Sequence, residues 1–444
     1  MDEKMTRMNP ALWAISFAGL WALSACSDGD SSSSASNSSS AEKQCIANFD
    51  CGDYTLEGVV VLSRHNIRAP LSDSKSIGLY TPPEWYAWPV KHQKLSPHGK
   101  LLEEKMGAYF REWISQNSLN AALENPDATV RIYANSIQRT IATATHFAAG
   151  MFPEANVEIE HHCNVDVMDS IFTPKITFLN DDYKKRALKQ VENLFGDGSL
   201  AGIGRKLAEN YALLSSVLDM EESVSCKEKK FCEFDTDDTE FILGVGHQPS
   251  MKGSLVTAMR AADALVLQYY ENAEDNADFG HNLTIEEWEK ISAVKDYYFE
   301  VLYTAPLVAV NVARPLLKEI LSELNTKGRL FSFLCGHDVN VGSVLAALGV
   351  SDYTLPKTIE SKTPIGVKFV IEKWRGKDGV EYANMSLVYQ TTEQLRNMTP
   401  LSLETPPESY RLIFEELSAN KDGLYKLSDV ESLFEKTIAA YDEL

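Results

Sequence analysis

The sequence has little positive charge, few cysteines and no long hydrophobic run. Its 444 residues include 42 lysines and arginines against 63 aspartates and glutamates, a formal net charge of −21. This balance argues against a general nucleic-acid binder, because a phosphate backbone requires a basic face. No Cys-x-x-Cys pair indicates a zinc or redox motif. With 44% hydrophobic and 24% charged residues, the chain has the composition of a globular protein.

The one strongly apolar run lies near the N-terminus. Ala11–Ala25 is uncharged and too short to span a bilayer comfortably, so it indicates a signal peptide over residues 1–25. The run ends in Leu-Ser-Ala-Cys, which resembles a bacterial lipobox and predicts a lipidated N-terminus at Cys26. An ordinary secretory signal followed by an incidental cysteine is the alternative.

A serine-rich stretch follows directly. Residues 26–44 hold little that could be buried, which predicts a flexible linker. By resemblance to known sorting rules, Ser27 after the lipidated cysteine favours the outer membrane. We therefore expect a protein of the bacterial periplasm or cell surface that is anchored to the outer membrane by its lipid.

The remaining cysteines agree with export. Cys45 and Cys51 form one close pair in polar surroundings, Cys226 and Cys232 form another, and an oxidising compartment would join each pair. Cys335 lies in an apolar run, which predicts a buried thiol.

Cys163 follows His161 and His162, which suggests a metal site as an alternative. Adjacent residues on a strand point to opposite faces, and no second ligand pair lies at a suitable spacing. We therefore predict no metal site.

Strand and helix patterns place α/β structure at both ends of the chain. Apolar and β-branched runs predict strands at 58–63, 129–133, 327–336, 368–372 and 384–389. Helical periodicity predicts helices at 96–113, 136–149, 181–194, 199–213, 252–271, 285–300, 306–324 and 341–348. We expect residues 45–444 to form one unit of the α/β class. Its three-layer α/β/α body, about 54–160 and 326–444, has a mostly parallel central sheet, and about 161–325 forms a helical cap insertion.

A compact basic loop follows the first predicted strand. The segment Arg64–Pro70 (RHNIRAP) places two arginines around His65, and its proline prevents continuation as a central strand. Arginine suits phosphate because its planar fork donates two parallel hydrogen bonds, and a neutral imidazole is a competent nucleophile. The alternative is a basic surface loop, but sites in α/β folds commonly lie beyond the carboxyl ends of strands.

A second polar turn follows a later strand. In Gly336–Asn340 (GHDVN), Asp338 could protonate a leaving alkoxide and His337 could bind a phosphoryl oxygen. Taken alone, Asp338 is better explained as a cap of the following helix. Beside the first motif, we favour the catalytic interpretation.

The two motifs together resemble the histidine acid phosphatases, the second branch of the histidine phosphatase superfamily. That family has an Arg-His-x-x-Arg-x-Pro loop and a distal His-Asp pair. Within it, further segments are similar to the bacterial periplasmic glucose-1-phosphatases. They follow in the same order over about residues 54–405 and are Ser63–Leu71, Tyr133–Thr145, Cys226–Lys230, Leu267–Glu271, Thr363–Gly366 and Glu393–Asn397.

The resemblance implies a role for each site residue. His65 would be the nucleophile that becomes phosphohistidine, and Asp338 would be the general acid for the leaving group. The phosphate would be bound by Arg64, Arg68, Arg139 and His337. Without the resemblance, Arg139 would be taken as a solvated charge on a helix. The implied partner is a small-molecule phosphate ester, and no cofactor is needed.

Two further positions bear on the substrate. Asn66 stands where the phytases of the family usually have glycine. The segment Ser63–Leu71 that contains it resembles the glucose-1-phosphatases. Gln248 stands where those enzymes carry a glutamate that meets the sugar, and a glutamine brings no charge.

We expect an acid phosphatase for phosphomonoesters, with sugar phosphates such as glucose 1-phosphate preferred. The alternatives are a phytase-like inositol-phosphate phosphatase and, in a different class, a phosphate-ester-binding lipoprotein without catalysis. The sequence leaves the oligomeric state open.

Overall fold

The computed structural model describes residues 49–272 and 277–444. The predicted signal peptide, the lipidation site Cys26, the serine-rich linker and Cys45 lie outside these residues. Within them, no helix is both long enough and apolar enough to cross a membrane. The described residues include both sequence motifs and all the predicted strands.

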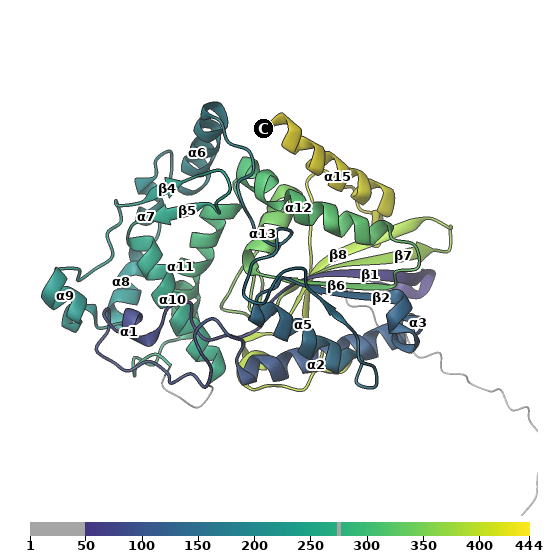
Figure 1. The fold of residues 1–444 in the computed structure, drawn as a ribbon, viewed down its shortest axis with the longest axis horizontal. Coiled ribbons are helices and arrows are strands. Elements are labelled where there is room, and N and C mark those ends of the chain that lie inside the picture. The colour runs from purple at the N-terminus through teal and green to yellow at the C-terminus, as the bar shows by residue number, and fades with distance from the viewer. Residues whose placement is uncertain (1–48, 273–276) are drawn as a thin grey trace, which may run out of the picture. The chain divides into compact units, whose positions relative to one another are not determined.

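A mixed eight-stranded sheet forms the centre of the α/β part (Figure 1). Its strands are β1 (Tyr54–Arg64), β2 (Val130–Ala134), β3 (Ile159–Glu160), β6 (Phe331–Gly336), β7 (Lys368–Gly376), β8 (Glu381–Tyr389), β9 (Glu408–Arg411) and β10 (Tyr425–Lys426). They follow the order β10-β8-β7-β1-β6-β2-β3, with β9 also paired to β8.

The direction of the strands divides the sheet into two parts. The pairs β1–β6, β6–β2 and β2–β3 are parallel. The pairs β1–β7, β7–β8, β8–β9 and β8–β10 are antiparallel. Strands β1, β2, β3, β6 and β8 therefore point the same way, which confirms a sheet of mostly parallel strands. The parallel part contains both sequence motifs.

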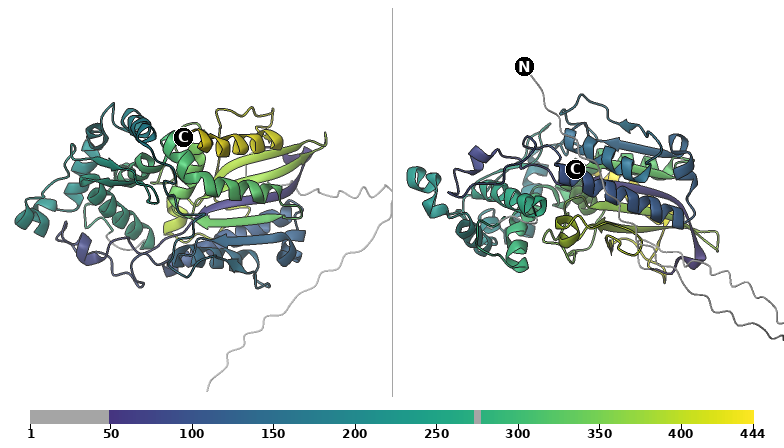
Figure 2. Two further views of the ribbon diagram at one scale, coloured as in Figure 1. Left: turned by 45° about the horizontal axis from the view of Figure 1, so that its top comes forward. Right: turned by 90° about the horizontal axis from the view of Figure 1, so that it is seen from below.

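Helices cover both faces of this sheet and complete the three layers (Figures 1 and 2). One face is covered by α2 (Pro97–Gln116) and α5 (Gln138–Met151), and the other by α12 (Pro306–Asn325), α13 (Asp338–Ala347) and α15 (Leu427–Ala440). Along β1, Val59 and Val61 pack toward the first pair of helices, and Val60 and Leu62 pack toward the other three. A strand buried on both faces is apolar throughout, which is why this segment could be recognised in the sequence.

The helices α2 and α5 cross at close range because each has a glycine at the crossing. A β-carbon on Gly107 would collide with the carbonyl oxygen of Phe147, and one on Gly150 would collide with that of Glu104. No larger residue fits at either position. The close crossing anchors α5, and the first turn of α5 carries Arg139.

A helical part lies beyond the carboxyl ends of β1 and β6 (Figure 1). It comprises α1 (Ser74–Ile77), α6 (Asp181–Phe195), α7 (Ala201–Arg205), α8 (Ala208–Val217), α9 (Val224–Lys229), α10 (Ser254–Glu271), α11 (Ile285–Tyr303) and the hairpin of β4 (Glu240–Ile242) and β5 (Ser250–Lys252). The remaining short elements are α3 (Ala121–Glu124), α4 (Pro126–Thr129), α14 (Thr392–Arg396), η1 (Cys51–Asp53), η2 (Met220–Glu222) and η3 (Tyr441–Glu443). Helices α10 and α11 pack against each other in one core and supply side chains to the site described below.

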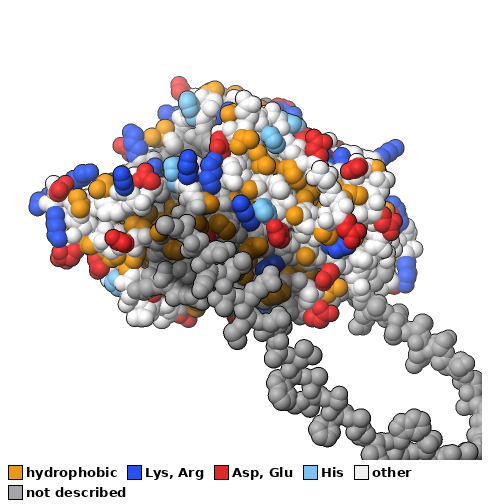
Figure 3. Space-filling model, turned by 60° about the horizontal axis from the view of Figure 1, so that its bottom comes forward, with side chains coloured by type: hydrophobic (Ala, Val, Ile, Leu, Met, Phe, Trp, Pro, Cys, Tyr) orange, Lys and Arg blue, Asp and Glu red, His pale blue; other side chains and the backbone are white. Residues whose placement is uncertain are grey.

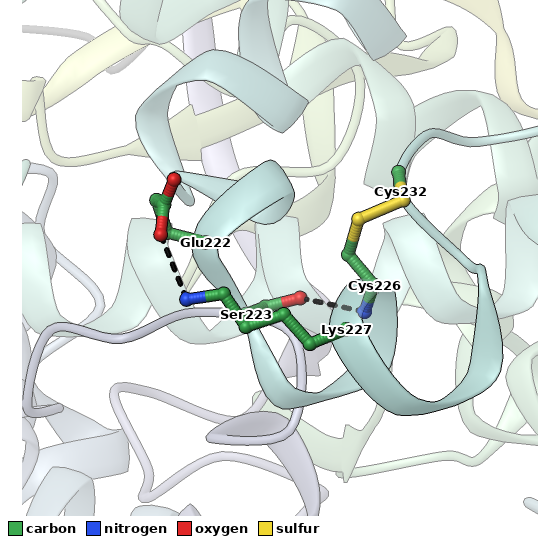
Figure 4. The surroundings of a disulfide bond; sticks show 5 residues. All are labelled: Glu222, Ser223, Cys226, Lys227 and Cys232. Carbon is green, nitrogen blue, oxygen red and sulfur yellow. Dashed lines mark hydrogen bonds and ion pairs between the residues drawn. A yellow bond between two sulfur atoms is a disulfide. The ribbon is translucent and has the colours of Figure 1, made fainter.

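A disulfide closes a small loop in the helical part. Cys226 and Cys232 are joined (Figure 4), which confirms that predicted pair. Ser223 caps α9 by accepting the amide of Cys226 at 3.1 Å, and Lys227 pairs with Glu222 at 2.7 Å. The disulfide and the cap together fix the short helix α9.

Cys51 is disulfide-bonded, and the two remaining described cysteines are free thiols. Cys335 is buried, as predicted, and Cys163 is half-buried. Among residues 49–272 and 277–444, no group of histidine, cysteine and acidic side chains is arranged to hold a metal ion.

Charges of both signs are interspersed on the surface. On the face drawn in Figure 3, lysines and arginines lie among aspartates and glutamates and form no single basic stripe. Exposed pairs such as Arg205 with Asp237 are typical of this surface and contribute little to stability. The compact basic cluster predicted from the sequence is instead buried, at the end of the sheet.

Candidate active site

Both sequence motifs lie at the carboxyl ends of neighbouring parallel strands. Arg64, the last residue of β1, pairs with Gly336 at the end of β6. The amide of His65 donates to the carbonyl of Gly336 at 3.1 Å. On the other side of β6, β2 leads into α5. The structure thus brings together six predicted residues, namely Arg64, His65, Arg68, Arg139, His337 and Asp338.

His65 is buried and uncharged at the centre of this cluster. Its Nδ1 lies 2.9 Å from the carbonyl oxygen of Asn66, and because a carbonyl only accepts, Nδ1 carries the proton. The lone pair is therefore on Nε2, which is free to act as a nucleophile. Burial lowers the pKa of His65 well below its usual 6.5, and the charge of Arg139 lowers it further. The imidazole thus stays neutral in mildly acidic solution.

Two of the three guanidiniums are neutralised by buried carboxylates. Arg64 lies 2.8 Å from Glu360 Oε1 and 3.5 Å from Asp338 Oδ2. Arg68 makes two hydrogen bonds to Asp263 on α10, at 3.1 and 3.0 Å. Such pairs hold both planar groups in fixed orientations. The sequence analysis missed Glu360 and Asp263.

Arg139 differs from the other two arginines. No carboxylate among the described residues lies within 4.0 Å of it, and its Nε has no hydrogen-bond partner. Burial, and then the charge of Arg68, lowers the pKa of Arg139 to about 10. A lowered pKa of this kind reflects the energetic cost of a buried cation without a counter-charge. Arg139 therefore lacks a carboxylate in direct contact, although the more distant Asp338 and Asp263 offset part of the cost of its charge.

His337 and Arg139 direct two donors at the same space. The Oδ1 of Asn135 accepts the amide of Asp169 at 2.9 Å, so its Nδ2 is the atom that donates to His337 Nε2, at 2.8 Å. Burial, and then Arg139, lowers the pKa of His337 well below 6.5, so its ring is neutral. Its proton is on Nδ1, which lies 3.4 Å from Arg139 Nη2. An anion between these two N–H groups would accept from both, so the geometry suits a phosphoryl oxygen.

Asp338 is the first residue of α13, at the edge of the cluster. Asp338 is 8% exposed. Its Oδ1 accepts a hydrogen bond from the amide of Val339 at 2.8 Å. Burial raises the pKa of Asp338, but the charges of Arg64 and Lys295 outweigh burial and lower the pKa overall. The carboxyl is therefore ionised in the empty site. The N-cap of α13 is His337, whose amide donates to Asn340 Oδ1 at 2.9 Å, so the structure does not support the capping interpretation of Asp338.

A buried network of charges supports Arg64. The Oε1 atom of Glu360 also lies 2.7 Å from Lys295 on α11, and Lys295 lies 2.9 Å from Asp296. Burial opposes ionisation of Glu360, but Lys295 and Arg64 lower its pKa to about 2. The helical part thus fixes the orientation of a guanidinium at the end of the sheet.

Asn66 is buried in the loop beside His65 and is hydrogen-bonded to protein atoms. Its Nδ2 donates to Glu103 at 2.9 Å, and its Oδ1 accepts the amide of Ile67 at 2.8 Å. Lys368 contacts the same oxygen of Glu103 at 3.0 Å. The carboxamide of Asn66 therefore holds the loop to α2 through Glu103, and its role in substrate specificity stays a prediction.

Gln248 lies outside the cluster, in the wall of a cavity of about 580 Å³. Its Oε1 accepts the hydroxyl of Tyr303 at 3.1 Å. The same wall contains Leu71, which directly follows the basic loop, together with His92 and Arg260. We call this cavity the Gln248 cavity; its wall combines aromatic, carboxamide and cationic side chains.

The chain matches known proteins over most of its length. Residues 55–388 match the family model of the histidine phosphatase superfamily, branch 2. The chain is 36% identical over 394 residues to a glucose-1-phosphatase of Providencia rettgeri, covering 87% of this chain and 93% of that protein. It is 34% identical over 388 residues to a glucose-1-phosphatase of Salmonella typhimurium, covering 86% and 92%. The solved structure of Hafnia alvei phytase in its apo form matches with a TM-score of 0.80 at 28% identity, covering 87% of this chain and 97% of that chain. The matched region contains both strand-end motifs, and the chain belongs to branch 2 of the histidine phosphatase superfamily.

Proposed function

We propose that this chain hydrolyses phosphomonoesters through a phosphohistidine at His65. The incompletely compensated guanidinium of Arg139, next to the neutral rings of His65 and His337, carries the proposal. A phosphate group would supply both the missing negative charge and the acceptor oxygens. Arg64 and Arg68 would add donors while keeping their own carboxylate partners.

The reaction would proceed in two steps. In the first, Nε2 of His65 forms a bond to phosphorus, the bond from phosphorus to the leaving oxygen breaks, and Asp338 protonates that oxygen. In the second, water forms a bond to phosphorus and the bond to Nε2 breaks. One proton of the water returns to Asp338, and inorganic phosphate is released.

The proton on Asp338 would arrive with the substrate. The carboxyl is ionised in the empty site because Arg64 and Lys295 outweigh the effect of burial. A bound phosphate adds negative charge to the same cluster, and nearby negative charge raises a carboxyl pKa. Phosphate monoesters lose their second proton near a pKa of ~6, so a monoanionic ester in acid would bring the proton that Asp338 needs.

Sugar phosphates such as glucose 1-phosphate are the proposed substrates. Two relatives at 34% and 36% identity are glucose-1-phosphatases. The Gln248 cavity supports this choice, because aromatic side chains and a carboxamide together suit a polyhydroxylated ring. Its aromatic residues are Tyr298, Phe299 and Tyr303.

An inositol phosphate is the second candidate. The cationic side chain of Arg260, together with His92, favours a leaving group that carries further phosphates. A phytase of Escherichia coli is 28% identical over 377 residues. The solved Hafnia alvei phytase in complex with myo-inositol hexakis sulphate matches with a TM-score of 0.79.

We further propose that the protein is exported and attached to the bacterial outer membrane through a lipid on Cys26. The apolar run Ala11–Ala25 and the serine-rich linker support this proposal. The disulfide between Cys226 and Cys232 also fits an oxidising compartment.

A panel of phosphate esters tests the function. Glucose 1-phosphate, phytate and an aryl phosphate would be compared at about pH 4–6 with wild type, His65→Ala and Gln248→Glu. We expect turnover by wild type, none by His65→Ala, and a preference for glucose 1-phosphate that increases in Gln248→Glu. A wild-type protein that binds phosphate without turning over any ester would instead indicate the non-catalytic binding lipoprotein.

A further inference from the structure

A second cavity reaches Asp338 from the side of α11 and α13. It has a volume of about 540 Å³, and its wall includes Asp338, Glu300, Tyr353 and Lys362. At its outer end lies Asp352, whose side chain is 93% exposed. The cavity, which we call the rear cavity, therefore extends from the protein surface to the proposed general acid.

The rear cavity is distinct from the Gln248 cavity. The wall of the Gln248 cavity does not include Asp338 or any residue of α13, whereas the rear cavity is lined by both. Phe299 and Tyr303 belong to both walls, so they form a partition between the two spaces. The partition is fixed on one side by the hydrogen bond from Tyr303 to Gln248. The two cavities thus share only these two aromatic side chains, and Asp338 lines the rear cavity alone.

One part of the wall of the rear cavity is polar and suited to water, although apolar side chains also line it. Lys362 lies 2.6 Å from Asp352 and 3.8 Å from Glu300, so these three charged side chains form a row along the cavity wall. Asp296 is also part of the wall, and its Oδ2 has no hydrogen-bond partner among the described residues. Buried polar atoms are normally satisfied by protein or by ordered water. At ~30 Å³ for each water molecule, the volume has room for more than ~10.

We propose that the rear cavity supplies the water that hydrolyses the phosphohistidine, while the leaving group enters and departs through the Gln248 cavity. This inference rests on the proposed function. Asp338 serves the leaving oxygen in the first step and the attacking water in the second, so both must come to the same side of phosphorus. If a single cavity served both molecules, the attacking water could enter only after the alcohol product had left. A second cavity that ends at Asp338 lets water reach the carboxyl while the alcohol is still leaving.

The test fills the rear cavity with a larger side chain. Ala346 on α13 lines the cavity and would be changed to Phe; its half-buried neighbour Ala347 lies outside that wall, and Ala347→Phe is the matched control. A second filling variant, Ser351→Trp, sits in the loop after α13 and places no demand on helix packing. Each variant would be given 4-nitrophenyl phosphate, with glucose added as a competing phosphate acceptor.

Three rates are measured: nitrophenol release in the first turnover, steady-state kcat, and the ratio of sugar phosphate to inorganic phosphate. In both filling variants we expect first-turnover release within about twofold of wild type, a fall in kcat of about fivefold or more, and a matching rise in the product ratio. The ratio rises because glucose still enters through the Gln248 cavity while water is restricted. The control should match wild type.

An unchanged product ratio in both filling variants would overturn the inference, as would an equal slowing of first-turnover release and kcat. The second result would mean that the rear cavity holds the leaving group or that the fold is disturbed. A wild-type protein without any turnover would refute the phosphatase proposal itself, which separates the two failures.

Discussion

Replacing Arg139 by methionine should make the empty protein more stable. Burial, and then the charge of Arg68, lowers the pKa of this guanidinium from the ordinary arginine value to about 10, and each pKa unit corresponds to ~1.4 kcal/mol. The charged side chain therefore costs the folded state roughly 3 kcal/mol. The cost is fully present at every pH below about 10 and declines gradually above that value, because the folded protein then loses the proton before the unfolded chain does. Methionine has a similar length and no charge, so it removes the cost.

The same substitution should weaken phosphate binding. Hydrogen bonds to a charged group contribute ~1.5–3 kcal/mol, so the affinity for inorganic phosphate and kcat/KM should each fall ~10- to 100-fold. Phosphate should therefore raise the denaturation midpoint of wild type much more than that of Arg139→Met.

Equilibrium unfolding in urea at pH 7, with and without inorganic phosphate, measures both effects. Arg111→Met is the control, because Arg111 is exposed on α2 and distant in sequence from both motifs. An Arg139→Met protein that is less stable than wild type without phosphate would refute the reasoning. So would a variant that keeps the full stabilisation by phosphate, since Arg139 would then not face the bound anion.

Three further predictions concern other groups of the cluster. Asp338→Asn should slow alkyl phosphates far more than aryl phosphates, because only a poor leaving group needs the proton, and an equal loss on both would argue against an acid. Burial, and then the charge of Arg139, lowers the pKa of His65 well below 6.5, so the nucleophile stays neutral in acid. The value of kcat/KM should therefore fall only well below pH 6.5. A fall in kcat/KM centred at pH 6.5 would contradict this. Asp263→Asn leaves Arg68 buried without its charged partner and should destabilise the fold by ~3–5 kcal/mol in urea unfolding. The control Asp237→Asn removes an exposed pair and should change stability little. Equal effects of the two substitutions would show that the buried pair is unimportant.

Long elements with a clear period could be predicted from the sequence, and short ones could not. β1 and β6 are buried on both faces, so their continuous apolar runs identified them. β9 and β10 have four and two residues, too few for any period to appear. α13 begins at Asp338, earlier than the predicted residue 341, because its first turn is polar. Its amphipathic pattern starts only after the residues that belong to the site.

Five of the six residues of the cluster could be predicted because they occur in two short motifs at strand ends, whereas Arg139 was found only through the family resemblance. Their carboxylate partners could not, since Glu360 lies 296 residues from Arg64 and Asp263 lies 195 residues from Arg68. Asp263 did offer a signal, as a carboxylate within the otherwise apolar stretch 261–267 of α10. The contacts of Asn66 could not be predicted either, because a sequence does not say toward which neighbours a loop side chain turns.

Trapping the covalent intermediate tests the central claim most directly. Wild type would be mixed with a phosphate-labelled ester, quenched within the first turnover in alkali, and digested so that the labelled peptide can be identified. A phosphohistidine is stable in alkali, so we expect the label on the peptide that contains His65 and none in His65→Ala. Turnover with the label on another residue, or with no labelled protein at all, would contradict the account.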